Sequence, residues 1–121
     1  MTRGEYAKGK RQRDFKRVLC VCTGGLLRSA TAAVILSRDP YGYNTRAVGT
    51  DPRALIIVDT VMIEWADEVV CMTMAHIRVV RALAPGFNGH CLVLGIEDDY
   101  EYRDPRLIDL IRQRYDAAAQ Q

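Results

Sequence analysis

Residues 17–38 read RVLCVCTGGLLRSATAAVILSR, and this stretch indicates the fold of the chain. Its first six residues form a short apolar run of the kind found in buried parallel strands. A Thr-Gly-Gly turn follows. From Ser29 to Arg38 the sequence is rich in alanine, and it begins with a hydroxyl side chain that can cap a helix. A strand, a glycine turn and a helix in immediate succession predict the opening unit of an α/β fold.

The rest of the chain continues this alternation of strands and helices. Further strands are expected at residues 45–48, 68–72 and 90–96, and further helices at residues 59–66 and 74–83 and after an Asp104-Pro105 capping pair. Such alternation predicts a parallel sheet with right-handed crossovers. We therefore predict a four-stranded, doubly wound, flavodoxin-like α/β sheet with helices on both faces. Ligands bind beyond the carboxyl ends of the strands in such folds, so the loop after Cys22 is the expected site.

The composition is typical of one globular domain in the cytoplasm. The chain has 121 residues, of which 49% are hydrophobic and 26% are charged, so a two-domain enzyme is excluded. No apolar run approaches the roughly 20 residues that a membrane span needs. The first residues also lack the apolar segment of a secretory signal. A membrane partner is not expected.

The basic residues are concentrated at the start of the chain. Residues 1–17 hold seven lysines and arginines against two acidic residues, whereas the whole chain has a net charge of +2. We expect residues 1–16 to be a flexible basic leader and residues 17–121 to form a single domain. The only aromatic residues of the leader are Tyr6 and Phe15, and no nucleic-acid-binding motif follows it, so a nucleic-acid partner is not expected.

Four cysteines lie in apolar, strand-like runs, and we expect all of them to be reduced. Cys22 alone is followed by glycines, an arginine and a serine, whereas Cys71 and Cys91 are expected to be core residues. His76 and His90 have no cysteine or histidine at metal-ligand spacing, so we expect capping or surface roles for them. The sequence therefore predicts neither a metal site nor a cofactor.

The loop after the first strand combines a thiol with an anion-binding arrangement. Five residues, Thr23, Gly24, Gly25, Leu26 and Leu27, separate Cys22 from Arg28 and Ser29. Inward-facing loop amides, a helix N-terminus and a guanidinium together form a cradle for phosphate. The same groups, with the Ser29 hydroxyl, stabilise negative charge on sulfur and make Cys22 a nucleophile at neutral pH. Residues 23–29 are therefore the predicted phosphate-binding loop.

The run VLCVCTGGLLRSATAAVIL resembles the start of the low-molecular-weight protein tyrosine phosphatases, whose signature is a strand, C-x5-R-S and a helix. WADEVVCMTMAHIRVV is similar to that family's third strand and following helix, and LGIEDDYEYRDPRLIDLI resembles a short bacterial branch of the family. The resemblance implies the family's fold and the hydrolysis of a phosphotyrosine protein or a small aryl phosphate. It also implies that Cys22 attacks phosphorus, that Arg28 holds the equatorial oxygens and that water then hydrolyses the phosphocysteine.

The loop departs from the family pattern at three positions. It has Gly25 where an asparagine is common, Leu27 where a second cysteine is common and Ala30 where a proline is common. Leu27 removes the neighbouring thiol with which the nucleophile could form a protective disulfide.

The resemblance also implies a general acid, and three aspartates are candidates. In the family the acid is an aspartate in an Asp-Pro pair after the last strand. Asp104 matches that pair by sequence, but its position favours helix capping. Asp98 and Asp99 directly follow the last expected strand. We expect the acid to be Asp99, then Asp98, with Asp104 third.

Other functions use similar features. An arsenate reductase needs further thiols near its nucleophile, whereas Cys71 and Cys91 are both expected inside strands. A sugar-transport phosphocarrier also holds phosphocysteine in a glycine turn, but it has no need of an arginine six positions later. A non-catalytic phospho-ligand binding module would keep the cradle and lack an effective acid. That alternative stays open beside the phosphatase.

Overall fold

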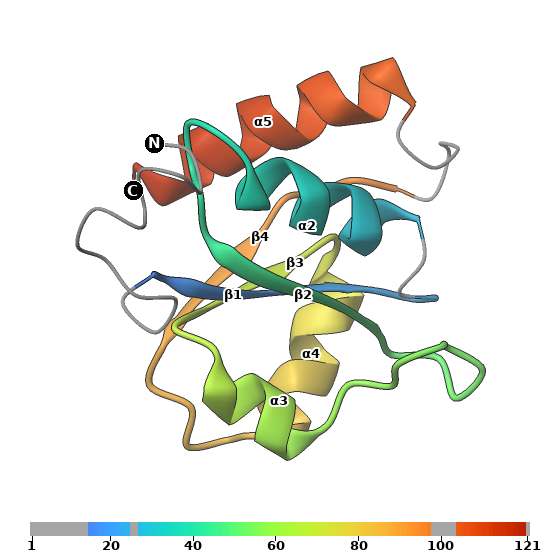
Figure 1. Cartoon of the computed structure of the whole chain (residues 1–121). Coiled ribbons are helices and arrows are strands. Elements are labelled where there is room, and N and C mark those ends of the chain that lie inside the picture. The colour runs from blue at the N-terminus through green and yellow to red at the C-terminus, as the bar shows by residue number, and fades with distance from the viewer. Residues whose placement is uncertain (1–14, 25–26, 98–103, 121) are drawn as a thin grey trace.

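The computed structural model describes residues 15–24, 27–97 and 104–120. Within these residues the chain forms a parallel sheet in the order β2-β1-β3-β4, with helices on both faces (Figure 1). The strands are β1 (Arg17–Cys22), β2 (Asn44–Gly49), β3 (Glu68–Cys71) and β4 (His90–Val93). The helices are α2 (Arg28–Ser37), α3 (Thr60–Trp65), α4 (Met74–Leu83) and α5 (Pro105–Ala119). The four-stranded α/β sheet predicted from the sequence is confirmed.

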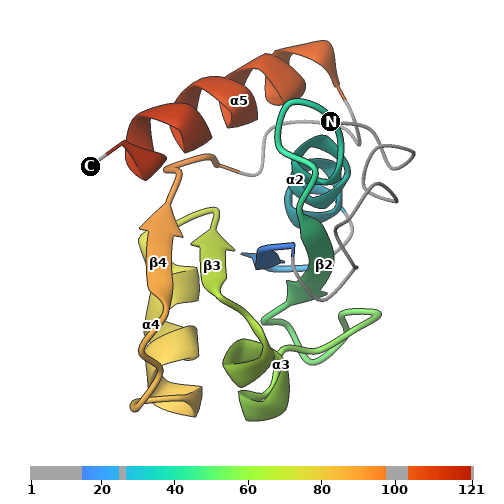
Figure 2. The ribbon, with the colours of Figure 1, turned by 60° about the vertical axis from the view of Figure 1, so that its left-hand side comes forward.

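Two apolar cores form because β1 is buried on both faces. Successive side chains of a strand point to opposite sides. Cys20 therefore packs in the core that includes residues of α2 and α5, and Leu19 packs in the core that includes residues of α3 and α4. Figure 2 shows the sheet between these two pairs of helices. Both side chains are fully buried, which identifies β1 as a central strand.

Two element boundaries differ from the sequence prediction, each for a local reason. Helix α2 begins at Arg28, and its N-cap is Leu27, which makes no side-chain cap bond, so the expectation that Ser29 caps this helix was wrong. The Ser29 hydroxyl instead faces Cys22 and the Val48 carbonyl. Strand β4 ends at Val93 rather than at residue 96, because Gly95 has a φ of +69° that interrupts the extended backbone.

An ion pair with a buried carboxylate joins the residue before β1 to β3 and α5. The Glu68 carboxylate is 4% exposed, accepts a hydrogen bond from the Tyr115 hydroxyl at 2.8 Å and lies 3.1 Å from the Lys16 ammonium. Lys16 also lies 4.6 Å from the centre of the Tyr43 ring. Residues 1–14, most of the expected leader, lie outside the described residues, so the flexible leader stays a prediction.

None of the described helices is long and apolar enough to cross a membrane.

Candidate active site

Cys22 lies at the carboxyl end of the central strand β1 and is 2% exposed. The backbone beyond β2 holds this strand end in place, because Thr50 N donates to Cys22 O and Asp51 N donates to Thr23 O, both at 2.9 Å. Gly49 lies against the same loop. A Cβ atom there would be 2.5 Å from Thr23 O and 2.7 Å from Gly24 C, so the loop position requires glycine at residue 49.

The Ser29 hydroxyl is placed to respond to the charge on Cys22. Its Oγ lies 3.0 Å from Cys22 Sγ and 3.4 Å from the Val48 carbonyl oxygen, and Ser29 is fully buried. A hydroxyl has one hydrogen to donate. With a Cys22 thiol, that hydrogen can go to Val48 O while the S–H group donates to Ser29. With a thiolate, Ser29 donates to sulfur and stabilises its charge.

Arg28 joins the predicted phosphate-binding loop to the segment after β4. It is the first residue of α2 and is 3% exposed. Its Nη1 donates to the Ile96 carbonyl at 2.7 Å, and its Nη2 donates to Thr23 Oγ1 at 3.5 Å. Ile96 is itself held to the sheet, since its N–H donates to Met72 O at 2.8 Å. A buried cation held beside a glycine loop can bind two oxygens of a phosphate.

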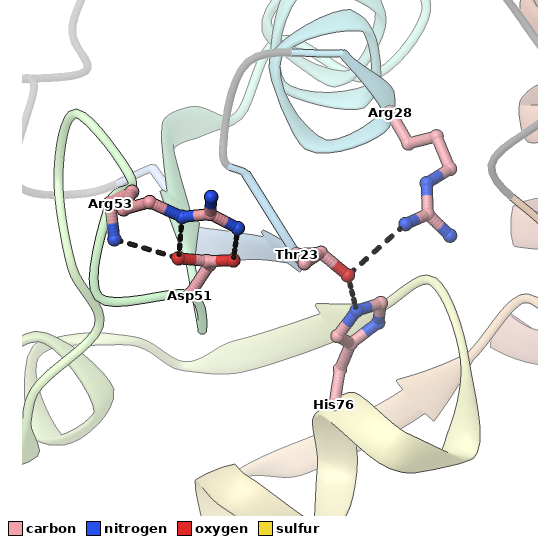
Figure 3. Close-up of polar contacts among 5 residues, drawn as sticks. All are labelled: Thr23, Arg28, Asp51, Arg53 and His76. Carbon is pink, nitrogen blue, oxygen red and sulfur yellow. Dashed lines mark hydrogen bonds and ion pairs between the residues drawn. The ribbon is translucent and has the colours of Figure 1, made fainter.

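His76 reaches the loop from the other face of the sheet. The sequence predicted its capping role but not its contact with the loop. It caps α4 as expected, because Thr73 N donates to its Nδ1 at 3.1 Å. The ring is not on the surface, however: His76 is 3% exposed, and its Nε2 lies 3.0 Å from Thr23 Oγ1 (Figure 3). The signal in the sequence is a Thr-x-x-His spacing directly after β3, at the sheet edge where Cys22 lies. His90, by contrast, is exposed.

An ion pair between Asp51 and Arg53 lies to one side of Thr23, away from Arg28 and His76 (Figure 3). The Asp51 carboxylate accepts from Arg53 N at 2.7 Å and from Arg53 Nη2 at 3.1 Å. The hydrogen bond from the Arg53 side chain lowers the pKa of Asp51, so this carboxylate is ionised and is a poor proton donor. The Arg53 side chain is 90% exposed, as expected of a solvated charge.

Three solved structures show which known proteins share this architecture. The tyrosine phosphatase Wzb from Escherichia coli K30 in complex with phosphate matches with a TM-score of 0.68 and 19% identity, over 88% of this chain and 97% of Wzb. This chain has the fold of the low-molecular-weight protein tyrosine phosphatases. The family's member from Bacillus subtilis matches with a TM-score of 0.64 and 18% identity, over 86% of this chain and 97% of that one.

The third structure is the YwlE arginine phosphatase, in a cysteine-to-serine mutant with a phosphorylated active-site serine. It matches with a TM-score of 0.62 and 20% identity, over 86% of this chain and 94% of YwlE. No protein-family model and no curated protein sequence matches the chain significantly. The similarity of this chain to known proteins therefore rests on solved structures, and it confirms the low-molecular-weight phosphatase fold that the sequence resemblance implied.

On this phosphatase fold the expected acids fall in different regions. Asp98 and Asp99 lie outside the described residues, as do Gly25 and Leu26 of the loop. Asp104 is the N-cap of α5, and its carboxylate accepts from Arg106 N at 2.9 Å and from Arg106 Nη2 at 2.9 Å. The hydrogen bond from the Arg106 side chain lowers the pKa of Asp104, so this carboxyl is ionised at neutral pH and is a poor proton donor.

The thiols of Cys20, Cys71 and Cys91 lie wholly or partly within the protein interior. All four cysteines are free, as the sequence predicts. Cys20 and Cys71 are fully buried; burial raises the pKa of Cys20 and raises that of Cys71 to about 12. Cys91 is half-buried, and burial raises its pKa as well. Among residues 15–24, 27–97 and 104–120, no three histidine, cysteine or acidic side chains form a group that could hold a metal ion.

Proposed function

We propose that this protein is a cysteine-dependent phosphatase that hydrolyses phosphotyrosine or similar aryl phosphate monoesters. The observation that carries the proposal is the contact of 3.0 Å between Cys22 Sγ and Ser29 Oγ, at a strand end that the buried Arg28 faces through Thr23. A nucleophile, a donor that stabilises its charge and a fixed cation are the parts that phosphoryl transfer through a thiol requires.

The first step transfers the phosphoryl group to sulfur. The Cys22 thiolate attacks phosphorus in line, an S–P bond forms and the bond from phosphorus to the phenolic oxygen breaks. Arg28 and the amides of residues 23–29 hold the equatorial oxygens, and an aspartic acid gives its proton to the leaving phenolate. Each well-placed donor of this kind is worth on the order of 2.7 to 4 kcal/mol of transition-state stabilisation. The reaction uses no group beyond the chain's own residues and water.

The second step returns the enzyme to its starting state. Water attacks phosphorus, the aspartate accepts a proton from that water, and the S–P bond breaks to release inorganic phosphate and the thiolate. Ser29 donates to the departing sulfur in this step, because its hydroxyl already lies 3.0 Å away. A buried donor that stabilises the leaving thiolate speeds the breakdown of the phosphocysteine.

Asp99 is our first choice for the acid and Asp98 our second. Both follow Ile96 closely in the sequence, and the Ile96 carbonyl accepts a hydrogen bond of 2.7 Å from Arg28. Asp104 is the weaker candidate, since its carboxylate is engaged by Arg106 as a helix cap. A proton delivered by such an acid contributes roughly 10² to 10⁴-fold to the rate.

Two findings on similar proteins agree with this chemistry. Wzb binds phosphate in its solved complex, and the YwlE mutant carries a phosphorylated active-site serine in place of a cysteine. The aryl substrate is inferred from the resemblance of residues 94–111 to the short bacterial tyrosine phosphatases. Four free thiols fit a reducing compartment, so we infer that the protein acts in the cytoplasm.

A non-catalytic phospho-ligand binding module is the second candidate function. It is favoured by the ordinary helix-capping role of Asp104, which leaves the acid to Asp98 or Asp99. An arsenate reductase is disfavoured, because burial holds Cys71 in its neutral form and away from a thiol relay.

The test is hydrolysis of para-nitrophenyl phosphate in EDTA by the wild type, Cys22→Ser and Arg28→Ala, with Cys91→Ser as the matched cysteine control. We expect turnover in the wild type and Cys91→Ser, none in Cys22→Ser and a loss of at least 10²-fold in Arg28→Ala. Turnover by Cys22→Ser would refute the nucleophile. A wild type that binds vanadate without turnover would establish the binding module instead.

A further inference from the structure

The Thr23 hydroxyl is the point at which three elements of the site meet. Thr23 directly follows the nucleophile at the end of β1 and is exposed at the surface. His76 Nε2 approaches its Oγ1 from α4 at 3.0 Å, and Arg28 Nη2 approaches it from α2 at 3.5 Å (Figure 3). His76 and Arg28 are each only 3% exposed. The exposed Thr23 hydroxyl is thus hydrogen-bonded to two buried side chains.

The hydrogen bonds of the His76 ring determine which nitrogen carries its proton. A backbone N–H can only donate, so the bond from Thr73 N at 3.1 Å requires a lone pair on Nδ1. The Thr73 hydroxyl, 3.2 Å from Nδ1, shares that lone pair as a second donor. In the neutral ring the proton is therefore on Nε2, which donates to Thr23 Oγ1.

This direction of donation determines what the Thr23 hydroxyl can do. Its oxygen accepts from His76 and from Arg28, which can only donate. The hydroxyl hydrogen is then left to act as a donor itself, and Thr23 is the first residue of the loop that receives the phosphate. We propose that His76 is a positioning residue that turns the Thr23 hydroxyl into a hydrogen-bond donor to the substrate's phosphoryl group.

The arrangement around His76 is rigid enough for such a role. The Thr73 backbone fixes one side of the ring, and the next residues of α4 that face inward, Ile77 and Val80, are buried in the core against β1 and β3. A ring held at both nitrogens cannot rotate without losing a hydrogen bond. Preorganised donors of this kind stabilise developing charge without further rearrangement. This inference rests on the proposed function, because it assigns Thr23 a phosphoryl group to bind.

The first experiment compares the wild type with Thr23→Val, which has the same shape without the hydroxyl, and with Thr23→Ser, which keeps it. Orthovanadate affinity and kcat/KM for para-nitrophenyl phosphate are measured. We expect Thr23→Val to lose about tenfold in both, as for one hydrogen bond, and Thr23→Ser to stay close to the wild type. The matched control is Thr60→Val, which removes a hydroxyl bonded to Leu83 O away from the site and should change neither quantity. Equal values for Thr23→Val and wild type would overturn the proposal.

The second experiment separates positioning from a purely structural role of His76. His76→Phe is measured in the wild-type background and in the Thr23→Val background. If His76 acts through Thr23, its replacement weakens vanadate binding severalfold in the first background and has no further effect in the second. The same loss in both backgrounds would mean that His76 only caps α4, and the proposal would fail.

A third measurement does not depend on whether His76→Phe folds. Long-range ¹⁵N–¹H correlation spectra of the wild-type protein assign the ring proton of His76 directly. We expect the Nε2–H tautomer in the wild type and a shifted Nε2 resonance in Thr23→Val. An Nδ1–H tautomer would reverse the hydrogen bonds and overturn the inference.

These measurements also distinguish the inference from the proposed function. A wild type that binds vanadate without hydrolysing aryl phosphates, and whose binding falls in Thr23→Val, would refute the phosphatase and support the role of His76. An active wild type whose activity is unchanged in Thr23→Val would support the phosphatase and refute the role of His76.

Discussion

The replacement Gly49→Ala tests whether the end of β2 shapes the proposed phosphate-binding loop. A methyl group at residue 49 would lie 2.5 Å from Thr23 O, 2.7 Å from Gly24 C and 2.7 Å from Ala54 Cβ. Ordinary contacts between such atoms are longer by about 1 Å. Two of the three are backbone atoms of the loop, which cannot move aside as a flexible side chain would. The loop or β2 must therefore shift by an appreciable part of 1 Å.

Both the activity and the stability should respond to this shift. Overpacking of this kind costs about 1 to 3 kcal/mol of folding free energy. A displacement of about 1 Å in a positioned catalytic group costs on the order of 10²-fold in rate. We therefore expect Gly49→Ala to lose one to two orders of magnitude in kcat/KM for an aryl phosphate and several degrees in Tm. Vanadate binding should weaken in parallel, because the cradle itself is distorted.

The matched control is Gly86→Ala, at a glycine where an added Cβ meets nothing within 4 Å. Replacing a glycine where the backbone allows alanine is neutral or stabilises a protein by up to about 1 kcal/mol. Activity and Tm are measured for both variants by steady-state kinetics and thermal denaturation. Wild-type kinetics in Gly49→Ala would refute the conclusion that this close approach shapes the loop.

Three further predictions follow from the hydrogen bonds and burial of single side chains. Ser29→Ala removes the donor to the Cys22 thiolate and should slow phosphocysteine breakdown by at least tenfold, measured as a larger pre-steady-state burst relative to the steady rate. Cys71, with its pKa raised to about 12 by burial, should resist iodoacetamide in the folded protein at pH 8 and react after unfolding, as followed by mass spectrometry; labelling in the folded state would contradict this. Asp104→Ala should lower the urea midpoint at pH 7, because α5 loses its cap. Since Arg106 lowers the pKa of the folded-state carboxyl, the contribution of Asp104 is present above the unfolded-state pKa near 4 and is lost as the pH falls, so urea midpoints of the two proteins should converge in acid.

The fold is predictable from the sequence because each element carries its own local signal. The apolar run that forms β1 has no polar face, which is the pattern of a strand covered on both sides. Asp104 before Pro105 marks the start of α5, and the structure shows that carboxylate accepting from the second residue of the helix. The prediction was wrong for Ser29, which was expected to cap α2. Its hydroxyl instead contacts Cys22 Sγ and the Val48 carbonyl.

The site is only partly predictable, because its second half comes from contacts between distant segments. Cys22, Arg28 and Ser29 lie within eight residues, so one motif is enough to bring them together. The contact between Thr23 and His76 spans 53 residues, and the contact between Arg28 and Ile96 spans 68. The first contact has only the Thr-x-x-His spacing after β3 as its signal, which a helix cap explains equally well, and the second contact has no signal in the sequence.

These long-range contacts explain how the glycine-containing loop after β1 is held at the carboxyl edge of the sheet. Gly24 and Gly25 contribute no side chains, so the loop conformation has to be imposed from outside. Gly49 confines the loop backbone from the side of β2, Asp51 N binds the Thr23 carbonyl, and His76 binds the Thr23 hydroxyl from the side of α4. Gly49 and Asp51 lie at or just after the end of β2 and His76 lies in α4, which follows β3, so the parallel sheet fixes the relative positions of these contacts. The carboxyl edge of the sheet thus supplies the rigidity that the glycine-rich sequence of the loop lacks.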